Sequence, residues 1–70
     1  MSAETSMLHI EVPRGLKALL VTLSQVDNTT LPAWCALRLA EACNREAFES
    51  GDARLIEWGE KCLREVDRQD

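Results

Sequence analysis

The sequence predicts a mainly helical protein, with a short N-terminal strand followed by three helices, that pairs with a second copy of itself. Apolar and polar residues alternate over residues 7–12, as they do in a half-buried strand. From residue 14 onward the apolar residues recur every three or four positions, as in an amphipathic helix. A single domain of 70 residues buries too little surface to be very stable alone, so oligomerisation is the expected source of further stability.

The strand is predicted at residues 7–12, and residues 1–6 are predicted to be a flexible terminus. His9 and Glu11 project from one side of this strand, and the apolar side chains project from the other. A lone strand leaves its backbone N–H and C=O groups unpaired, so the same strand of a second copy is the expected partner. Three apolar side chains of the strand are then expected in the dimer interface: Leu8, Ile10 and Val12.

The first helix is predicted at residues 14–26. Pro13 ends the strand and suits the first turn of a helix, because a proline there loses no hydrogen bond. Arg14 and Lys17 are the only charged residues of this helix before Asp27, so we expect it to be heavily buried. Its apolar residues follow the helical period: Leu16, Leu19, Leu20, Leu23 and Val26.

The second helix is predicted at residues 31–50. The polar turn at residues 27–30 offers side-chain oxygens that can cap its first N–H groups, and Pro32 suits its first turn. We expect Leu37 and Phe48 in the dimer interface. The predicted inner face consists mostly of small side chains, which allow another helix to approach closely: Ala33, Ala36, Leu37, Ala40, Cys43 and Ala47.

The third helix is predicted at residues 53–67, because Gly51 is a typical helix terminator and Asp52 a typical N-cap. Gly59 lies inside this helix, where glycine costs about 1 kcal/mol relative to alanine. Close packing against a bulky neighbour is the simplest reason for a glycine at this position. The predicted apolar face is as follows: Leu55, Ile56, Gly59, Cys62, Leu63 and Val66.

The composition favours a protein partner over nucleic acid, metal or membrane. The net charge of −4 is unfavourable for gripping phosphates and better suited to a basic protein surface. Three cysteines without a CxxC pair argue against a disulfide framework and a zinc site, and favour the cytoplasm. The first six residues do not resemble a signal peptide, and no apolar stretch is long enough to span a bilayer. We expect no metal and no cofactor.

The first 45 or so residues resemble the ribbon-helix-helix family. The similarity is carried by the alternating residues 8–12, by Pro13, by the leucines of the first helix and by the polar turn that ends at Thr30. This resemblance implies an intertwined homodimer whose paired strands enter the DNA major groove, as in a transcriptional repressor or an antitoxin. Here His9 and Glu11 occupy the positions where the family carries its base-reading side chains, so the sequence departs from the family at the DNA-contacting surface.

The size, acidity and helical character also resemble small phage-encoded inhibitors and anti-activators, some of which cover the DNA-binding surface of a host transcription factor. We therefore expect a non-enzymatic regulatory protein that binds and inhibits a partner protein. A ribbon-helix-helix repressor or antitoxin is the alternative. Trp58 is expected to lie beside the apolar stripe of its helix, as an interface anchor or as a side chain at the edge of the core. The residues expected to contact the partner are Trp58, Glu57, Lys61 and Glu11.

Overall fold

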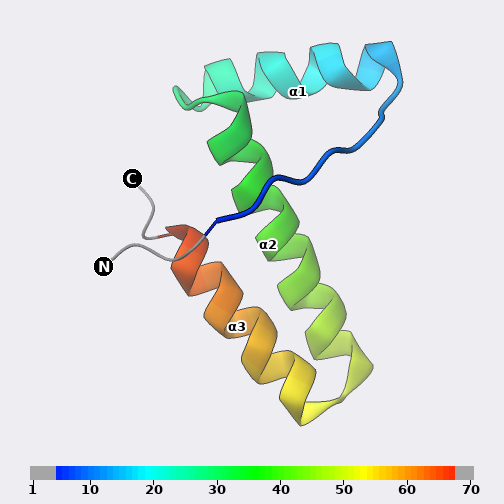
Figure 1. The fold of residues 1–70 in the computed structure, drawn as a ribbon, viewed down its shortest axis with the longest axis vertical. Coiled ribbons are helices and arrows are strands. Elements are labelled where there is room, and N and C mark those ends of the chain that lie inside the picture. Colours follow the sequence, from blue (N-terminus) through cyan, green and yellow to red (C-terminus); the bar gives the residue numbers. More distant parts are fainter. Residues whose placement is uncertain (1–4, 68–70) are drawn as a thin grey trace.

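The computed structural model describes residues 5–67 and is built from three helices (Figure 1). An irregular segment, residues 5–13, leads into α1 (Arg14–Val26), which is followed by α2 (Leu31–Ser50) and α3 (Ala53–Asp67). The helices α2 and α3 run antiparallel as a hairpin, and α1 lies steeply across the beginning of α2. Within the described chain α1 contacts α2 but not α3.

The predicted strand at residues 7–12 is wrong. These residues are irregular, and no segment between residues 5 and 67 forms a strand with which they could pair. The alternating pattern indicates which side of a strand would be apolar, but it supplies no second strand to accept the hydrogen bonds. The prediction of a ribbon-helix-helix fold is therefore also wrong. Of the terminus predicted at residues 1–6, residues 1–4 lie outside the described part of the chain.

Local side-chain chemistry explains where α2 and α3 begin and end. The Thr30 hydroxyl accepts a hydrogen bond from the Ala33 N–H at 3.3 Å and caps the first turn of α2. Gly51 ends α2 in the left-handed region, at φ +74°, where a side chain would be strained. The Asp52 carboxylate accepts a hydrogen bond from the Arg54 N–H at 2.9 Å and caps α3. A two-residue connection, Gly51 and Asp52, can therefore reverse the chain between two helices.

The hairpin is tight because small residues lie where its two helices cross. Gly59 and Ala40 are two of the three residues that are buried among those described. A Cβ atom on Gly59 would lie 3.2 Å from the Asn44 Cα and 3.3 Å from the Ala47 Cβ. The predicted reason for this glycine, close packing, is confirmed. The neighbour that requires it is the backbone of α2 rather than a bulky side chain.

Polar contacts hold the corner between α1 and α2. The Asp27 carboxylate accepts a hydrogen bond from the indole N–H of Trp34 at 2.8 Å and another from Arg38 at 3.2 Å. Arg38 also pairs with Glu41 at 2.7 Å, and its guanidinium carbon lies 5.2 Å from the centre of the Trp34 ring. We call Asp27, Trp34 and Arg38 the corner clasp. Asn28, in the turn itself, adopts φ +56°, a conformation that asparagine tolerates better than most residues.

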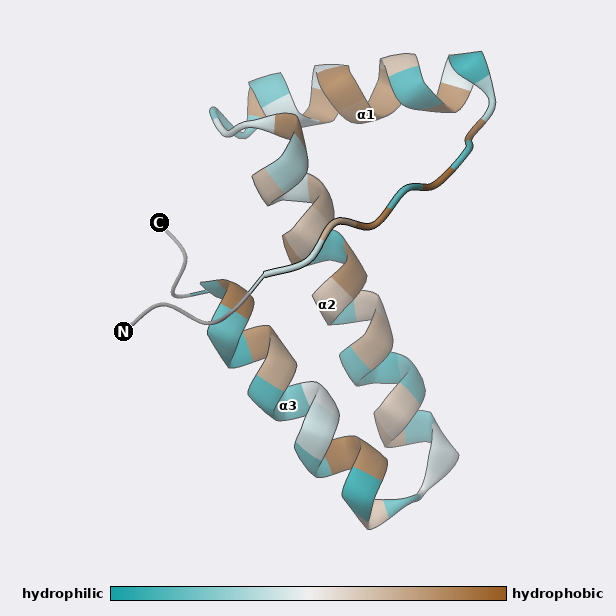
Figure 2. Cartoon of the chain, viewed as in Figure 1, coloured by the Kyte–Doolittle hydropathy of each residue, from teal (hydrophilic) through white to brown (hydrophobic). Residues whose placement is uncertain are grey.

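The single chain leaves many of its large apolar side chains exposed. Figure 2 shows hydrophobic residues along α1, α3 and the irregular segment. The expectation that α1 is heavily buried is wrong, because Ser24 is its only buried residue. The apolar face of α1 lacks a cover since α1 touches only one end of α2. Among the described residues, eleven large apolar side chains are exposed: Met7, Leu8, Ile10, Leu16, Leu19, Leu23, Val26, Leu39, Phe48, Leu55 and Trp58.

Candidate protein-binding groove

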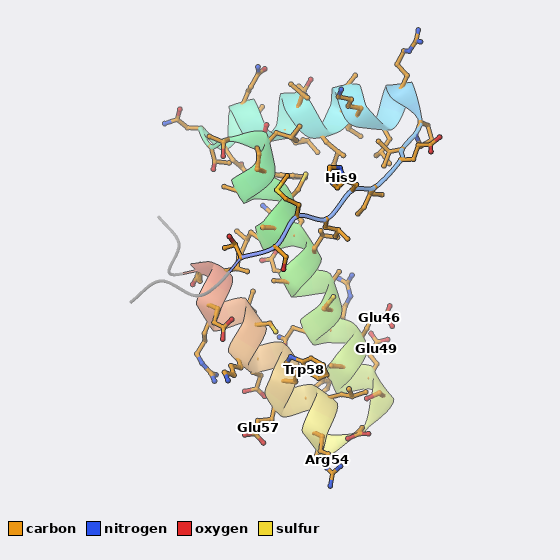
Figure 3. The ribbon with its side chains drawn as sticks, viewed as in Figure 1. His9, Glu46, Glu49, Arg54, Glu57 and Trp58 are labelled. Atoms are coloured by element: carbon orange, nitrogen blue, oxygen red, sulfur yellow. The ribbon has the colours of Figure 1, made fainter. Side chains whose placement is uncertain are left out.

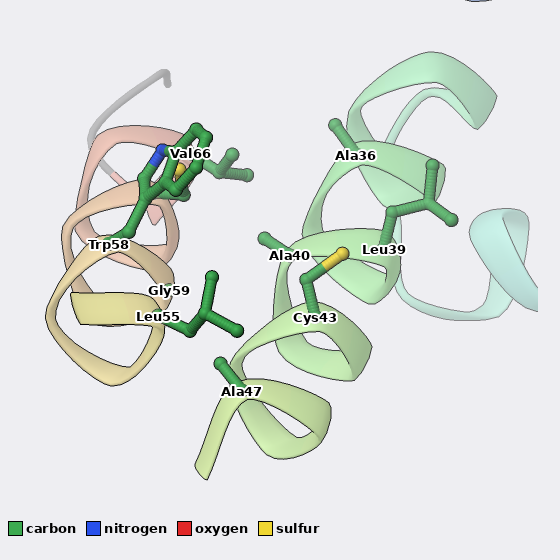
Figure 4. A pocket seen from close by; sticks show the side chains of 10 residues that line it. Ala36, Leu39, Ala40, Cys43, Ala47, Leu55, Trp58, Gly59 and Val66 are labelled. Atoms are coloured by element: carbon green, nitrogen blue, oxygen red, sulfur yellow. The ribbon is translucent and has the colours of Figure 1, made fainter. Parts of the chain in front are cut away.

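An apolar groove of about 460 Å³ runs along one face of the hairpin, between α2 and α3 (Figure 4). We call this feature the hairpin groove. Its α2 wall is made mostly of small side chains that repeat at helical spacing, with Leu39 as the one large member. The residues of the α2 wall are Ala36, Leu39, Ala40, Cys43 and Ala47.

The α3 wall of the hairpin groove carries the larger side chains. Leu55 points toward α2 near one end, and Val66 lies near the other end of the wall (Figure 4). The two walls together enclose the apolar groove. The residues of the α3 wall are Leu55, Trp58, Gly59, Cys62 and Val66.

Trp58 is the largest side chain of the hairpin groove. It lines the α3 wall, yet 65% of its surface is exposed. The sequence predicted this side chain to lie beside the apolar stripe, and the structure places it at that edge. An exposed tryptophan on the wall of an apolar groove has the chemistry of an interface anchor, because its large flat surface loses water on contact.

The other residues expected to contact a partner do not line the hairpin groove. Glu57 and Lys61 lie on α3 and are exposed, and Figure 3 shows Glu57 directed away from α2. Glu11 is exposed on the irregular segment, near His9. The structure therefore gathers Glu57, Lys61 and Trp58 on one helix and leaves Glu11 on a separate element.

The residues expected in a dimer interface are scattered over the structure. Leu8 and Ile10 are exposed on the irregular segment, and Val12 is half-buried. The argument that placed these three residues in the interface depended on the strand and no longer applies. On α2, Leu37 is half-buried, whereas 72% of Phe48 is exposed. Neither of these residues lines the hairpin groove.

Sequence reasoning missed several members of the groove. Leu39 lay outside the predicted inner face of α2, and 44% of it is exposed on the groove wall. Leu55, Cys62 and Val66 were predicted as apolar, but as parts of a filled core. The helical pattern carried no signal for the groove, because periodicity does not determine how two helices are rotated about each other.

The histidine and the cysteines of the described chain are not gathered into a metal-binding cluster. His9, the one histidine of the sequence, is exposed on the irregular segment, while the three free cysteines lie on α2 and α3. Residues 5–67 bring together no group of three or more metal-ligating side chains. The hydrogen bond to Glu41 raises the pKa of Arg38, with a smaller contribution from Asp27, so the guanidinium keeps its charge in the corner clasp.

Comparison with known proteins found no matching family, curated protein or solved structure. In the part of the chain that the structure describes, every helix is too short or too polar to cross a bilayer. The hairpin groove is the candidate binding site that the described surface offers. Its chemistry suits an apolar surface such as one face of a helix.

Proposed function

We propose that the protein is a small non-enzymatic regulator that binds another protein through the hairpin groove and thereby inhibits it. One observation carries the proposal: the groove is apolar along both walls, and Trp58 is 65% exposed at its edge. Exposed apolar surface is unfavourable in water, and an aromatic anchor beside a groove is typical of protein interfaces. The partner should present an amphipathic helix, whose apolar side chains can enter a groove of this shape.

The acidic character of the chain supports a protein partner with a basic surface. Glu57 and Lys61 remain the predicted contacts at the rim of the site, where exposed charges affect the rate of association more than its strength. A transcription regulator is the partner we favour, by analogy with small phage-encoded anti-activators. We propose that the protein acts in the cytoplasm, where its three free cysteines would remain reduced. The DNA-binding alternative depended on a ribbon that the described chain lacks.

Photo-crosslinking in the native host cells tests the proposal. Trp58 is replaced by benzoylphenylalanine, an aromatic residue that forms covalent bonds with nearby chains under light. The control carries the same residue at Glu49, an exposed position on α2 outside the groove (Figure 3). We expect position 58 to capture a protein other than the chain itself and position 49 to capture none. Capture of the chain alone, or equal capture from both positions, would contradict the proposal.

The captured protein then provides the inhibition assay. Trp58→Ala should weaken its binding by about 2 kcal/mol or more, roughly thirtyfold in Kd, and relieve its inhibition by a similar factor. Phe48→Ala is the matched control, because it removes an aromatic side chain that is 72% exposed and lies outside the groove. We expect that control to change Kd less than about threefold. Equal losses for both variants would show that the groove is not the binding site.

A further inference from the structure

The helix α1 is amphipathic, but its apolar face is only partly covered in the single chain. Four apolar side chains of this face are between 38% and 75% exposed: Leu16, Leu19, Leu23 and Val26. With Leu20 they are spaced at i, i+3, i+4, i+7 and i+10, the pattern of a helix that anchors itself in an apolar groove. The chain therefore carries both an unoccupied groove and a helix of the kind that fits one.

The arrangement of the corner keeps α1 away from the groove of its own chain. Asp27, at the end of α1, is fixed to Trp34 and Arg38 in the first two turns of α2. The helix α1 leaves this corner at a steep angle and makes no contact with α3, although α3 forms half of the groove (Figure 1). An α1 that enters the groove must therefore come from another molecule.

Length and charge both match α1 to the hairpin groove. Thirteen helical residues span about 20 Å, and the α2 wall from Ala36 to Ala47 spans roughly 17 Å. The only charged residues of α1 are Arg14 and Lys17, both basic. Residues 31–67, which form the hairpin, contain eight acidic residues and five basic ones. The helix and the hairpin thus carry opposite net charges, which favours their association.

The exposed area of the chain is consistent with a missing partner. The chain exposes 6276 Å², whereas a compact monomer of 7.9 kDa exposes about 4,400 Å². Its radius of gyration is 13.4 Å, against about 11 Å for a compact chain of the same length. Exposed apolar side chains on the irregular segment, on α1 and along the groove contribute to this surplus. A standard interface takes roughly 800 Å² from each partner, so these faces can supply one.

We propose that a second copy of the chain covers the hairpin groove, with α1 of each copy lying in the groove of the other. Each chain has one such helix and one such groove, so a two-fold pair satisfies both and leaves no free end. This proposal rests on the proposed function, because both assign the binding of a helix to the same groove. In the free protein the second copy occupies the site, and a foreign helix must displace α1 to bind. Self-association would in this way regulate access to the partner.

The mass of the intact chain in solution, measured by analytical ultracentrifugation over a wide range of concentrations, is the first test. We expect twice the 7.9 kDa of one chain. Leu19→Glu places a charge on the α1 face and Leu39→Glu places one in the groove, and each should weaken the dimer at least about tenfold. Both side chains are exposed in the single chain, at 53% and 44%, so helicity by circular dichroism should persist. Gln25→Glu, on the polar side of α1, is the matched control and should remain dimeric.

Mixing the two charged variants distinguishes the proposed arrangement from other dimers. The Leu39→Glu chain keeps an intact α1 and the Leu19→Glu chain keeps an intact groove, so one sound contact forms only in the mixture. We expect a heterodimer from two variants that are each monomeric alone. Pairing of α1 with α1 would leave Leu39→Glu dimeric, and pairing of groove with groove would leave Leu19→Glu dimeric. Either of these two results would overturn the proposal. A monomeric wild-type chain or an open-ended assembly would overturn it as well.

The outcome for self-association is separable from the outcome for the proposed function. The Leu19→Glu chain has a vacant groove, so benzoylphenylalanine at position 58 of that chain reports foreign partners alone. Capture of a foreign protein by a wild-type chain that is monomeric would support the function and refute the second copy. A wild-type dimer, together with no foreign capture by Leu19→Glu, would support the second copy and refute the function.

Discussion

Replacing the two glycines of the helical regions with alanine, one at a time, tests the close approach of α2 and α3. Gly15 and Gly59 both lie inside helices, so either substitution removes the same backbone flexibility from the unfolded chain, a gain of about 0.5–1 kcal/mol. A Cβ atom on Gly15 would meet nothing within 4 Å. Gly15→Ala should therefore retain the gain and stabilise the protein.

The same substitution at Gly59 meets the backbone of α2. The new Cβ would lie 3.2 Å from the Asn44 Cα and 3.3 Å from the Ala47 Cβ, closer than carbon atoms normally approach. Neither atom can rotate away, so the helices must separate, and overpacking of this kind costs about 1–3 kcal/mol. The helical gain offsets part of this cost. We expect Gly59→Ala to lower the free energy of unfolding by up to about 2 kcal/mol.

Thermal unfolding followed by circular dichroism at one chain concentration measures both variants. For a chain of this size, 1 kcal/mol corresponds to a shift of about 4–8 °C in Tm. The two variants should therefore differ by roughly 4–20 °C, with Gly15→Ala the more stable. A Gly59→Ala protein as stable as Gly15→Ala would refute the reasoning, because it would show that α2 and α3 lie farther apart at this position.

Three further predictions concern the turns. Thr30→Ala, which removes the cap of α2, should lower the free energy of unfolding by about 1 kcal/mol in urea titration, while Thr30→Ser should change it little. Gly51→Ala, at φ +74°, should cost about 1–2 kcal/mol and Gly51→Asn less, and equal losses would contradict the left-handed turn. Asp27→Ala removes the acceptor of the Trp34 indole N–H, so it should lower the free energy of unfolding by about 0.5–1.5 kcal/mol. It should also shift the fluorescence of Trp34, whereas Glu41→Ala should leave that fluorescence unchanged.

The elements that the sequence predicted correctly are those that depend on neighbours in the sequence. The ends of α2 and α3 are set by Thr30, Gly51 and Asp52, whose capping contacts span two or three residues. The strand could not be judged in this way, because a strand depends on hydrogen bonds to a distant segment. Residues 7–12 have the right pattern and lack that partner.

The candidate site was predicted only in part, for a related reason. Helical periodicity shows which face of a helix is apolar, but not what covers that face or how two helices are rotated about each other. Trp58 was therefore recognised from its position beside a stripe, whereas Leu39 was missed across the groove. The exposure of α1 was missed for the same reason. Its leucines predict that this face is buried, but they do not identify the element that covers it.

The attachment of α1 at one end only has a consequence for the order of folding. The contacts between α2 and α3 join residues that a two-residue turn brings together, and helical proteins with such local contacts fold in microseconds to milliseconds. The helix α1 has few contacts with the hairpin, so it gains little stability when the hairpin forms. We therefore expect the hairpin to form first. With the proposed second copy covering each groove, the ordering of α1 would be a slower step whose rate rises with the concentration of the chain.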